Sequence, residues 1–255
     1  MKRILLFLSA LFIATTAIAH TINWYVDGSV YHTTTCESGE NVTPPTAPEK
    51  YGYTFRRWDT YAPIEYLEST GTQYIDTGVI PNTNTSSLVD FEYTNWQRGT
   101  GTQVYYNVIG SRTSNVSIDQ YSWTFEPYSG SAYAGFGVEE ADLGKSLFKL
   151  NVRTVIYMDK YYWKKDGIVY ASFKDGIIES TYPMFLFGRS TSGKLANNSA
   201  AKIYHTKIYD NNVLVRNFIP VLDKDGTPCM YDLVEHKFYY NAGTGDFIAG
   251  PIVGE

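Results

Sequence analysis

The groups that carry most protein chemistry are scarce in this sequence. It has two cysteines and four histidines among 255 residues, and no histidine accompanies a G-x-S-x-G elbow or a cysteine-protease signature. Two cysteines that are not spaced as a pair cannot build a structural zinc site. Cys36 and Cys229 are either joined by a disulfide between two domains or are separate buried thiols. We therefore expect no enzyme, and no metal centre built on cysteine or histidine.

Clusters of basic residues are also missing. The chain carries 21 Lys and Arg against 26 Asp and Glu, a formal net charge of −5. A protein this acidic, without a patch of Lys and Arg, is a poor partner for nucleic acid or for anionic membranes. No stretch after residue 19 is apolar enough to cross a bilayer, so we expect no membrane insertion of the mature chain.

The first nineteen residues have the pattern of an export signal. Lys2 and Arg3 supply a positive start, residues 4–18 are mostly apolar, and Ala17-Ile18-Ala19 is a small-x-small cleavage site. The alternative is a membrane anchor, but the apolar run is short and no stop-transfer charge follows it. Residues 1–19 are therefore predicted to be a signal peptide. The protein is expected to be secreted, to the outside of the cell, the cell surface or a bacterial periplasm.

Helical patterns are nearly absent from the rest of the sequence. We find no stripe of apolar residues at helical spacing over about ten positions. Apolar and polar residues alternate instead, as in residues 88–94 and 148–156, and such alternation places one face of a strand on a core. Many short strands separated by turns predict an all-β sandwich or barrel. The turn sequences include Asp27-Gly28, Asp166-Gly167, Asn211-Asn212 and Asp225-Gly226.

A domain boundary is expected after a short proline-rich unit. We place this unit at residues 20–59, a linker at 60–63 and a larger domain at 64–255. The run GENVTPPTAPEKYGYTFRRW, residues 39–58, resembles the Listeria–Bacteroides repeat, the internalin-type B-repeat of bacterial surface proteins. The resemblance implies a small β-grasp-like module that acts as a spacer or adhesion element. The small core of this module is then expected from Tyr53, Phe55 and Trp58.

The larger domain resembles the concanavalin A-like (laminin-G-like) jelly-roll domains of bacterial and phage-associated secreted proteins. The resemblance rests on residues 64–85 and 201–251, with YYWKKDGIVYASF and FLFGRSTSGK between them. It implies a jelly-roll sandwich whose first and last strands pair, which would bring residues 72–78 beside the Gly-rich loop 241–245. This fold hosts both lectins and hydrolases, so the resemblance alone does not assign a function.

The carboxylates of the glycan-cleaving members of this superfamily are not found. Laminarinase-type glucanases carry E-x-D-x-x-E on one strand, because the acid and the nucleophile must stand about 5 Å apart. The nearest cluster, Glu139-Glu140-Ala141-Asp142, is expected in a solvated loop. Calcium is one alternative for acids such as Asp76, Asp90 and Asp119, and solvated surface carboxylates are the other. We expect no other cofactor.

Binding of extracellular carbohydrate is our principal functional hypothesis. Lectin sites stack aromatic rings on sugars and add hydrogen bonds, and aromatic residues make up 16% of this sequence. Burial in the core is the competing explanation for each ring. Trp96 is the best candidate for an exposed ring, because polar residues surround it. The candidate ligand-binding residues are Trp96, Tyr106, Tyr121, Trp123, Tyr128 and Trp163.

Two other functions stay open as alternatives. The B-repeat resemblance favours a structural or adhesive module that contacts a protein, as part of a bacterial surface protein or a phage-derived protein. A glycan-active hydrolase is the third hypothesis, and it would need two carboxyl groups that converge in a cleft.

Overall fold

The computed structural model divides the chain into two compact units, residues 1–59 and residues 60–255. The structure describes residues 19–26, 29–37, 40–52, 54–55, 61–96, 104–113, 120–127, 129–174 and 176–253. These residues form strands and connecting segments without a helix, as predicted. Within the same ranges, accordingly, no helix offers the length and apolar character that crossing a membrane requires. Residues 1–18 of the predicted signal peptide lie outside the described residues.

The N-terminal unit contains a two-stranded antiparallel sheet, formed by β1 (Ala19–Val26) and β2 (Ser29–Glu37). The strands flank the predicted turn Asp27-Gly28, which lies outside the described residues, as do Tyr53 and Trp58. The side chain of Phe55 is 36% exposed, more than a core residue would be. The B-repeat fold of this unit therefore stays a prediction.

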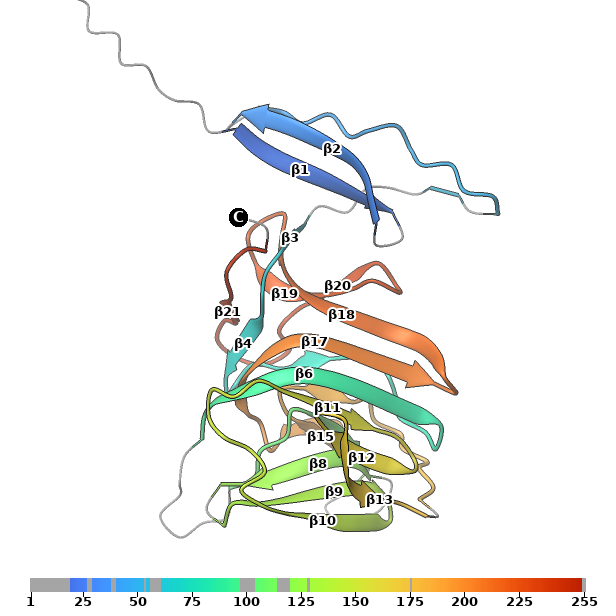
Figure 1. Ribbon diagram of the computed structural model, residues 1–255, viewed down its shortest axis with the longest axis vertical. Coiled ribbons are helices and arrows are strands. Elements are labelled where there is room, and N and C mark those ends of the chain that lie inside the picture. Colours follow the sequence, from blue (N-terminus) through green and yellow to red (C-terminus); the bar gives the residue numbers. More distant parts are fainter. Residues whose placement is uncertain are drawn as a thin grey trace, which may run out of the picture. The chain divides into compact units, whose positions relative to one another are not determined.

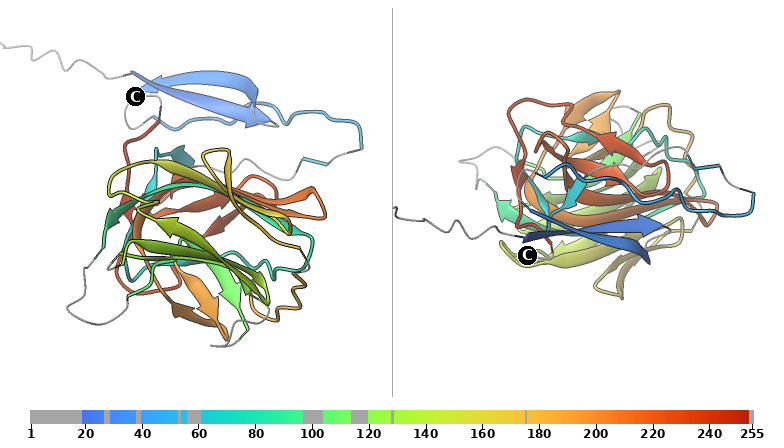
Figure 2. Two further views of the ribbon diagram at one scale, coloured as in Figure 1. Left: turned by 60° about the horizontal axis from the view of Figure 1, so that its bottom comes forward. Right: turned by 90° about the horizontal axis from the view of Figure 1, so that it is seen from above.

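The larger unit is a sandwich of an eight-stranded and an eleven-stranded sheet (Figure 1). The smaller sheet has the order β10 (Glu139–Lys145), β9 (Ser131–Gly137), β8 (Gln120–Glu126), β7 (Ile109–Arg112), β14 (Phe185–Leu186) and β5 (Ile75–Asp76), with β15 (Arg189–Thr191) beside β7 and β16 (Lys194–Ala196) beside β15. The larger sheet has the order β13 (Ile168–Ser172), β12 (Tyr162–Lys165), β11 (Thr154–Met158), β6 (Thr85–Asn95), β17 (Ala200–Asp210), β18 (Val213–Asp223), β19 (Pro228–Asp232) and β20 (Lys237–Tyr239), with β3 (Tyr61–Pro63), β4 (Leu67–Thr70) and β21 (Ile248–Ala249) attached. Figure 2 shows the twist of these strands from two further sides.

The core lies between the two sheets and is rich in aromatic rings. Val89 and Phe91 of β6 are fully buried, as the alternating pattern of residues 88–94 predicted. Tyr121, Trp123 and Phe125 of β8 alternate in the same way and are at most 2% exposed. The rings of Phe91 and Trp123 lie 6.3 Å apart, so side chains from the two sheets meet in one core.

The ends of the larger unit close on one another, as the jelly-roll resemblance implied. Thr72 donates a hydrogen bond from Oγ1 to the carbonyl oxygen of Thr244 at 2.8 Å. The backbone N–H of Ala242 donates to the carbonyl oxygen of Tyr74 at 2.9 Å. Strand β21 pairs with β4 beside this contact. The predicted meeting of residues 72–78 with the loop 241–245 is confirmed.

The strand β3 corrects the predicted linker. Tyr61 and Pro63 pair with Asp223 and Val221 of β18, so residues 61–63 belong to the sandwich. The described part of the larger unit therefore starts with a strand.

Left-handed backbone turns connect neighbouring strands at two predicted places. Asp166 and Gly167, between β12 and β13, have φ of 49° and 81°. Asn211 and Asn212, between β17 and β18, have φ of 48° and 62°. Asn, Asp and Gly adopt this conformation more readily than other residues, and two such residues in a row form the turn that matches the twist of a hairpin.

Candidate functional site

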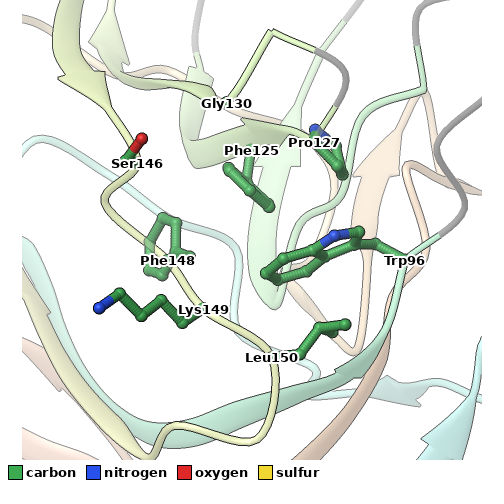
Figure 3. A pocket seen from close by; sticks show the side chains of 8 residues that line it. All are labelled: Trp96, Phe125, Pro127, Gly130, Ser146, Phe148, Lys149 and Leu150. Carbon is green, nitrogen blue, oxygen red and sulfur yellow. The ribbon is translucent and has the colours of Figure 1, made fainter.

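An open hollow lies where the chain leaves β6 at Trp96. Its volume is about 670 Å³, and ligand pockets commonly measure about 300–1,000 Å³. In Figure 3 the Trp96 ring projects toward the centre, with Phe125 above it, Phe148 opposite and Leu150 below. We call this the Trp96 hollow. It is lined by Trp96, Phe125, Pro127, Gly130, Ser146, Phe148, Lys149 and Leu150.

Edge-to-face contacts hold the half-buried Trp96 ring in place. Its centroid lies 4.9 Å from that of Phe125 and 5.8 Å from that of Tyr93. Phe125 in turn lies 5.3 Å from Phe148, also edge to face. Such pairs contribute about 0.5–1.5 kcal/mol each beyond the burial of area. The ring is therefore oriented before any ligand arrives.

An irregular segment after β10 forms one wall of the hollow, where we had predicted a strand over residues 148–156. Only Thr154–Met158 is a strand, and the prediction is wrong for residues 148–153. Asn151 has φ of 56°, and its N–H donates to the carbonyl oxygen of Tyr93 at 2.8 Å. This left-handed residue ends the alternation, and Leu150 is left 38% exposed.

Polar groups stand beside the aromatic lining of the hollow. The hydroxyl of Ser146 and the ammonium of Lys149 belong to exposed residues and can form hydrogen bonds with a ligand. None of the described residues that line the hollow carries a carboxylate, an imidazole or a thiol. The lining therefore suits binding and lacks groups for acid–base or nucleophilic catalysis at neutral pH.

The structure places one of the predicted ligand-binding residues, Trp96, in the hollow. Tyr121, Trp123 and Trp163 are at most 1% exposed and belong to the core. A ring without an accessible face cannot stack on a sugar, so these three predictions are wrong. The hydroxyl of Tyr121 is also occupied inside the core, where it donates a hydrogen bond to the carbonyl oxygen of Met158 at 2.9 Å.

The last two predicted residues have different outcomes. Tyr106 is 8% exposed and also belongs to the core, so its ring offers almost no surface to a ligand. Tyr128 lies outside the described residues and stays a prediction. Sequence reasoning missed Phe148 and Leu150 as lining residues, because it placed both on the buried face of a regular strand.

A second, smaller depression lies at the other end of β6. Its one carboxylate, that of Asp159, accepts hydrogen bonds from the N–H groups of Tyr161 and Tyr162, both at 2.7 Å, and from the Tyr157 hydroxyl at 2.9 Å. This carboxylate holds a turn and has little capacity left for a ligand. The depression is lined by Asn84, Thr85, Ser86, Tyr157, Asp159, Lys160, Tyr161, Asn211 and Asn212.

The acids considered for calcium are engaged within the protein or lie outside the described residues. Both carboxylate oxygens of Asp90 accept from Arg153 at 2.8 Å, and Asp76 accepts from the N–H of Gly78 at 2.9 Å. Asp119 is not among the described residues. Within the described ranges, no group of three or more His, Cys, Asp or Glu could hold a metal ion. Nothing in this geometry supports the calcium alternative at Asp90.

The acidic run Glu139-Glu140-Ala141-Asp142 is part of a strand, β10, and the predicted loop is wrong. Neighbouring residues of a strand point to opposite faces. Glu139 accepts a hydrogen bond from the N–H of Lys174 at 3.0 Å, whereas Glu140 is exposed. The two adjacent carboxylates are therefore not a converging catalytic pair.

The structure has both Cys36 and Cys229 as free thiols, so it does not contain the disulfide that the sequence left open. Cys229 is fully buried beside Val221 and Tyr231. Burial raises the pKa of its thiol to about 12, and the negative charge of Asp223 adds to this shift.

We expect the two thiols to differ in their reaction with an aromatic disulfide reagent at pH 8. The raised pKa keeps the Cys229 thiol protonated, and only the thiolate attacks, so native protein should release about one equivalent, from Cys36. Urea should expose Cys229 and give about two equivalents without reductant. No release in urea would mean that the two cysteines are bridged after all.

Comparison with solved structures finds proteins whose backbone partly aligns with that of this chain. The solved structure of the CBM40 module of the Ruminococcus gnavus IT-sialidase bound to α2,3-sialyllactose aligns with a TM-score of 0.40 and 10% identity, over 57% of this chain and 89% of that chain. The same module without a named ligand aligns with a TM-score of 0.39 and 11% identity, over the same shares. No family model matches the chain, and no curated protein matches its sequence. The function therefore has to be argued from the chain's own geometry.

Proposed function

We propose that the larger unit is a non-catalytic module that binds carbohydrate in the Trp96 hollow. The observation that carries the proposal is a pre-oriented, half-buried tryptophan that projects from the wall of an open, aromatic-lined hollow toward its centre. Sugar rings present apolar C–H faces and polar rims. An aromatic ring can cover the first, while nearby hydroxyl and ammonium groups bind the second.

Replacement of Trp96 by Ala should weaken glycan binding about thirtyfold. A central aromatic anchor in a recognition site typically contributes about 2 kcal/mol, which corresponds to this factor. The mature chain is first screened on a glycan array, and the affinity for the best ligand is then measured by calorimetry for the wild type and for Trp96→Ala.

Two variants serve as controls for this experiment. Tyr161→Ala removes a ring that is 51% exposed and lines the other depression, and it should bind as the wild type does. Trp96→Phe keeps an aromatic face and should retain part of the affinity. Equal binding by wild type and a folded Trp96→Ala variant would exclude the hollow as the glycan site.

A protein-interaction module is the second candidate, and strand β13 favours it. This strand lies at the edge of the eleven-stranded sheet, and Ile168, Val169 and Tyr170 are 61%, 48% and 40% exposed. Exposed apolar side chains on an edge strand are typical of surfaces that pair with another chain. Absence of any glycan ligand, together with a protein partner lost on Val169→Lys, would favour this candidate.

We also propose that the module acts outside the cytoplasm. The basis is the N-terminal sequence, in which Ala17-Ile18-Ala19 is the predicted cleavage site. Mass spectrometry of the protein exported from an expressing bacterium should give an N-terminus at His20. In the same proposal the N-terminal unit is a B-repeat-like spacer, and the larger unit is a concanavalin A-like jelly roll.

A further inference from the structure

Two side chains that bind metals in many proteins face each other across the hairpin of β1 and β2. The backbone register pairs His20 of β1 with Cys36 of β2. Cross-strand partners in an antiparallel pair point to the same face, with their β-carbons about 4.5–5.5 Å apart. Cys36 is a half-buried free thiol and His20 is exposed. A solute can therefore reach both side chains on one face of the hairpin.

A hydrogen bond between side chains supports this register. The indole Nε1 of Trp24 donates to Oγ1 of Thr34 at 2.9 Å. Thr34 pairs with Ile22, and side chains two residues apart on a strand share a face. His20 and Cys36 lie two residues beyond Ile22 and Thr34, and so on the same face. The imidazole and the thiol are brought together by a pairing that side chains as well as backbone hold in place.

Cleavage at the predicted site adds a third ligand to this pair. Removal of residues 1–19 makes His20 the first residue, so that its nitrogen becomes an amine. The amine and the imidazole of one residue can bind the same ion. Within the described part of the chain, no three side chains of His, Cys, Asp or Glu could hold a metal ion. The amine is therefore the group that completes a set of three.

Zn²⁺ is the ion that suits an amine, an imidazole and a thiolate. Thiolates favour soft and borderline ions, and imidazole also suits zinc. Tetrahedral zinc bonds to sulfur and nitrogen bring these atoms within about 3.6 Å of one another, a separation that side chains of neighbouring strands can reach. This set differs from the sequence expectation of no metal centre built on cysteine or histidine, because strand pairing joins two ligands and cleavage creates the third.

We propose that the mature chain binds one Zn²⁺ ion through the α-amine and imidazole of His20 and the thiolate of Cys36. The inference rests on the proposed export step, which frees the amine, and leaves the fourth tetrahedral position to water. After cleavage, this pair is the last one at the open end of the hairpin. A two-stranded sheet is marginally stable in water by itself, and a metal ion bound by both strands restrains that end.

The test uses the full mature chain, produced so that His20 is its first residue, with Co²⁺ as a spectroscopic probe. Bound Co²⁺ should give a thiolate-to-cobalt charge-transfer band in the near ultraviolet, with one ion per chain, and Zn²⁺ should displace it. The band should be absent in Cys36→Ser. Cys36→Ser and His20→Ala should each bind Zn²⁺ about a hundredfold or more weakly, since even groups that only orient metal ligands contribute about 10–100-fold.

Two further chains serve as matched controls. His32→Ala removes a histidine that pairs with Trp24 and lies about 13 Å along β2 from Cys36. This variant should bind Zn²⁺ as the mature chain does. A chain that starts at Ala17 keeps the side chains of His20 and Cys36 but lacks the amine at His20. It should bind Zn²⁺ about a hundredfold or more weakly.

A second measurement needs no variant of the protein. Zn²⁺ at ten times its Kd leaves about a tenth of the sites free, and a zinc-bound thiolate is not available to attack a disulfide. The reaction of Cys36 with the aromatic disulfide reagent should therefore slow about tenfold, and a chelator should restore its rate. Hydrogen exchange of the amides of β1 and β2 should also slow when Zn²⁺ is added.

The outcomes separate the zinc site from the other proposals. A cobalt spectrum without the charge-transfer band, or equal Zn²⁺ affinity of the mature chain and Cys36→Ser, overturns the site. Equal affinity of the mature chain and the chain that starts at Ala17 overturns the role of the amine and, with it, the proposed ligand set. An exported protein whose first residue is not His20 overturns the cleavage, while the binding data still decide whether the hairpin holds zinc.

Discussion

Replacement of Trp163 by Ala is expected to destabilise the larger unit by about 3–5 kcal/mol, the usual cost of removing a fully buried large aromatic side chain. Trp163 of β12 is 0% exposed. Its ring lies 6.3 Å from that of Trp123 of β8, edge to face, and therefore joins the two sheets. Removal of the ring would leave a cavity at the centre of the core. The melting temperature should fall by about 10 °C.

Trp163→Phe is the matched control for this substitution. The indole N–H of Trp163 is buried without a hydrogen-bond partner in the described structure. Phe keeps most of the ring and removes this unsatisfied donor, so its cost should be about 1.5 kcal/mol or less. Urea unfolding followed by far-UV circular dichroism measures both variants. A loss below about 1 kcal/mol for Trp163→Ala would contradict the central position of this ring.

The sequence predicted the fold best where a local pattern and the tertiary structure agree. Residues 88–94 alternate between apolar and polar, and they lie within β6, where one face is buried. Residues 148–156 alternate as well, but Asn151 adopts a left-handed conformation and bonds to β6, so the strand starts only at Thr154. Periodicity shows which residues could share a face. It does not show where a tertiary contact breaks the strand.

The candidate site could be predicted only in part. Trp96 stood out because polar residues surround it in the sequence, which indicates a ring near solvent. Trp123 lies in an equally aromatic and polar stretch, and its burial follows from contact with Phe91 and Trp163 of the other sheet. Composition alone does not separate core rings from binding rings.

Gly243→Ala is expected to destabilise the larger unit strongly, because Gly243 lies where residues 72–74 contact the loop 241–245. A β-carbon at Gly243 would overlap the carbonyl oxygen of Thr72 and lie 3.1 Å from the ring of Tyr74. Backbone cannot move aside as a flexible side chain can, so the first and last segments of the larger unit would have to separate. The hydrogen bonds that Thr244 exchanges with Thr72 would weaken with them. We expect a loss of about 3 kcal/mol.

Gly226→Ala separates this steric effect from the general cost of replacing a glycine. Gly226 has φ of 79° and nothing within 4 Å of its added β-carbon, so only backbone strain of about 1 kcal/mol applies. Urea unfolding gives the two costs, and hydrogen exchange locates them. In Gly243→Ala the amides of Ala242 and Thr244 should exchange faster, whereas in Gly226→Ala they should keep their protection. Equal costs for the two variants, with protected amides in both, would show that residues 72–74 and 241–245 do not pack as closely as the closure of the sandwich requires.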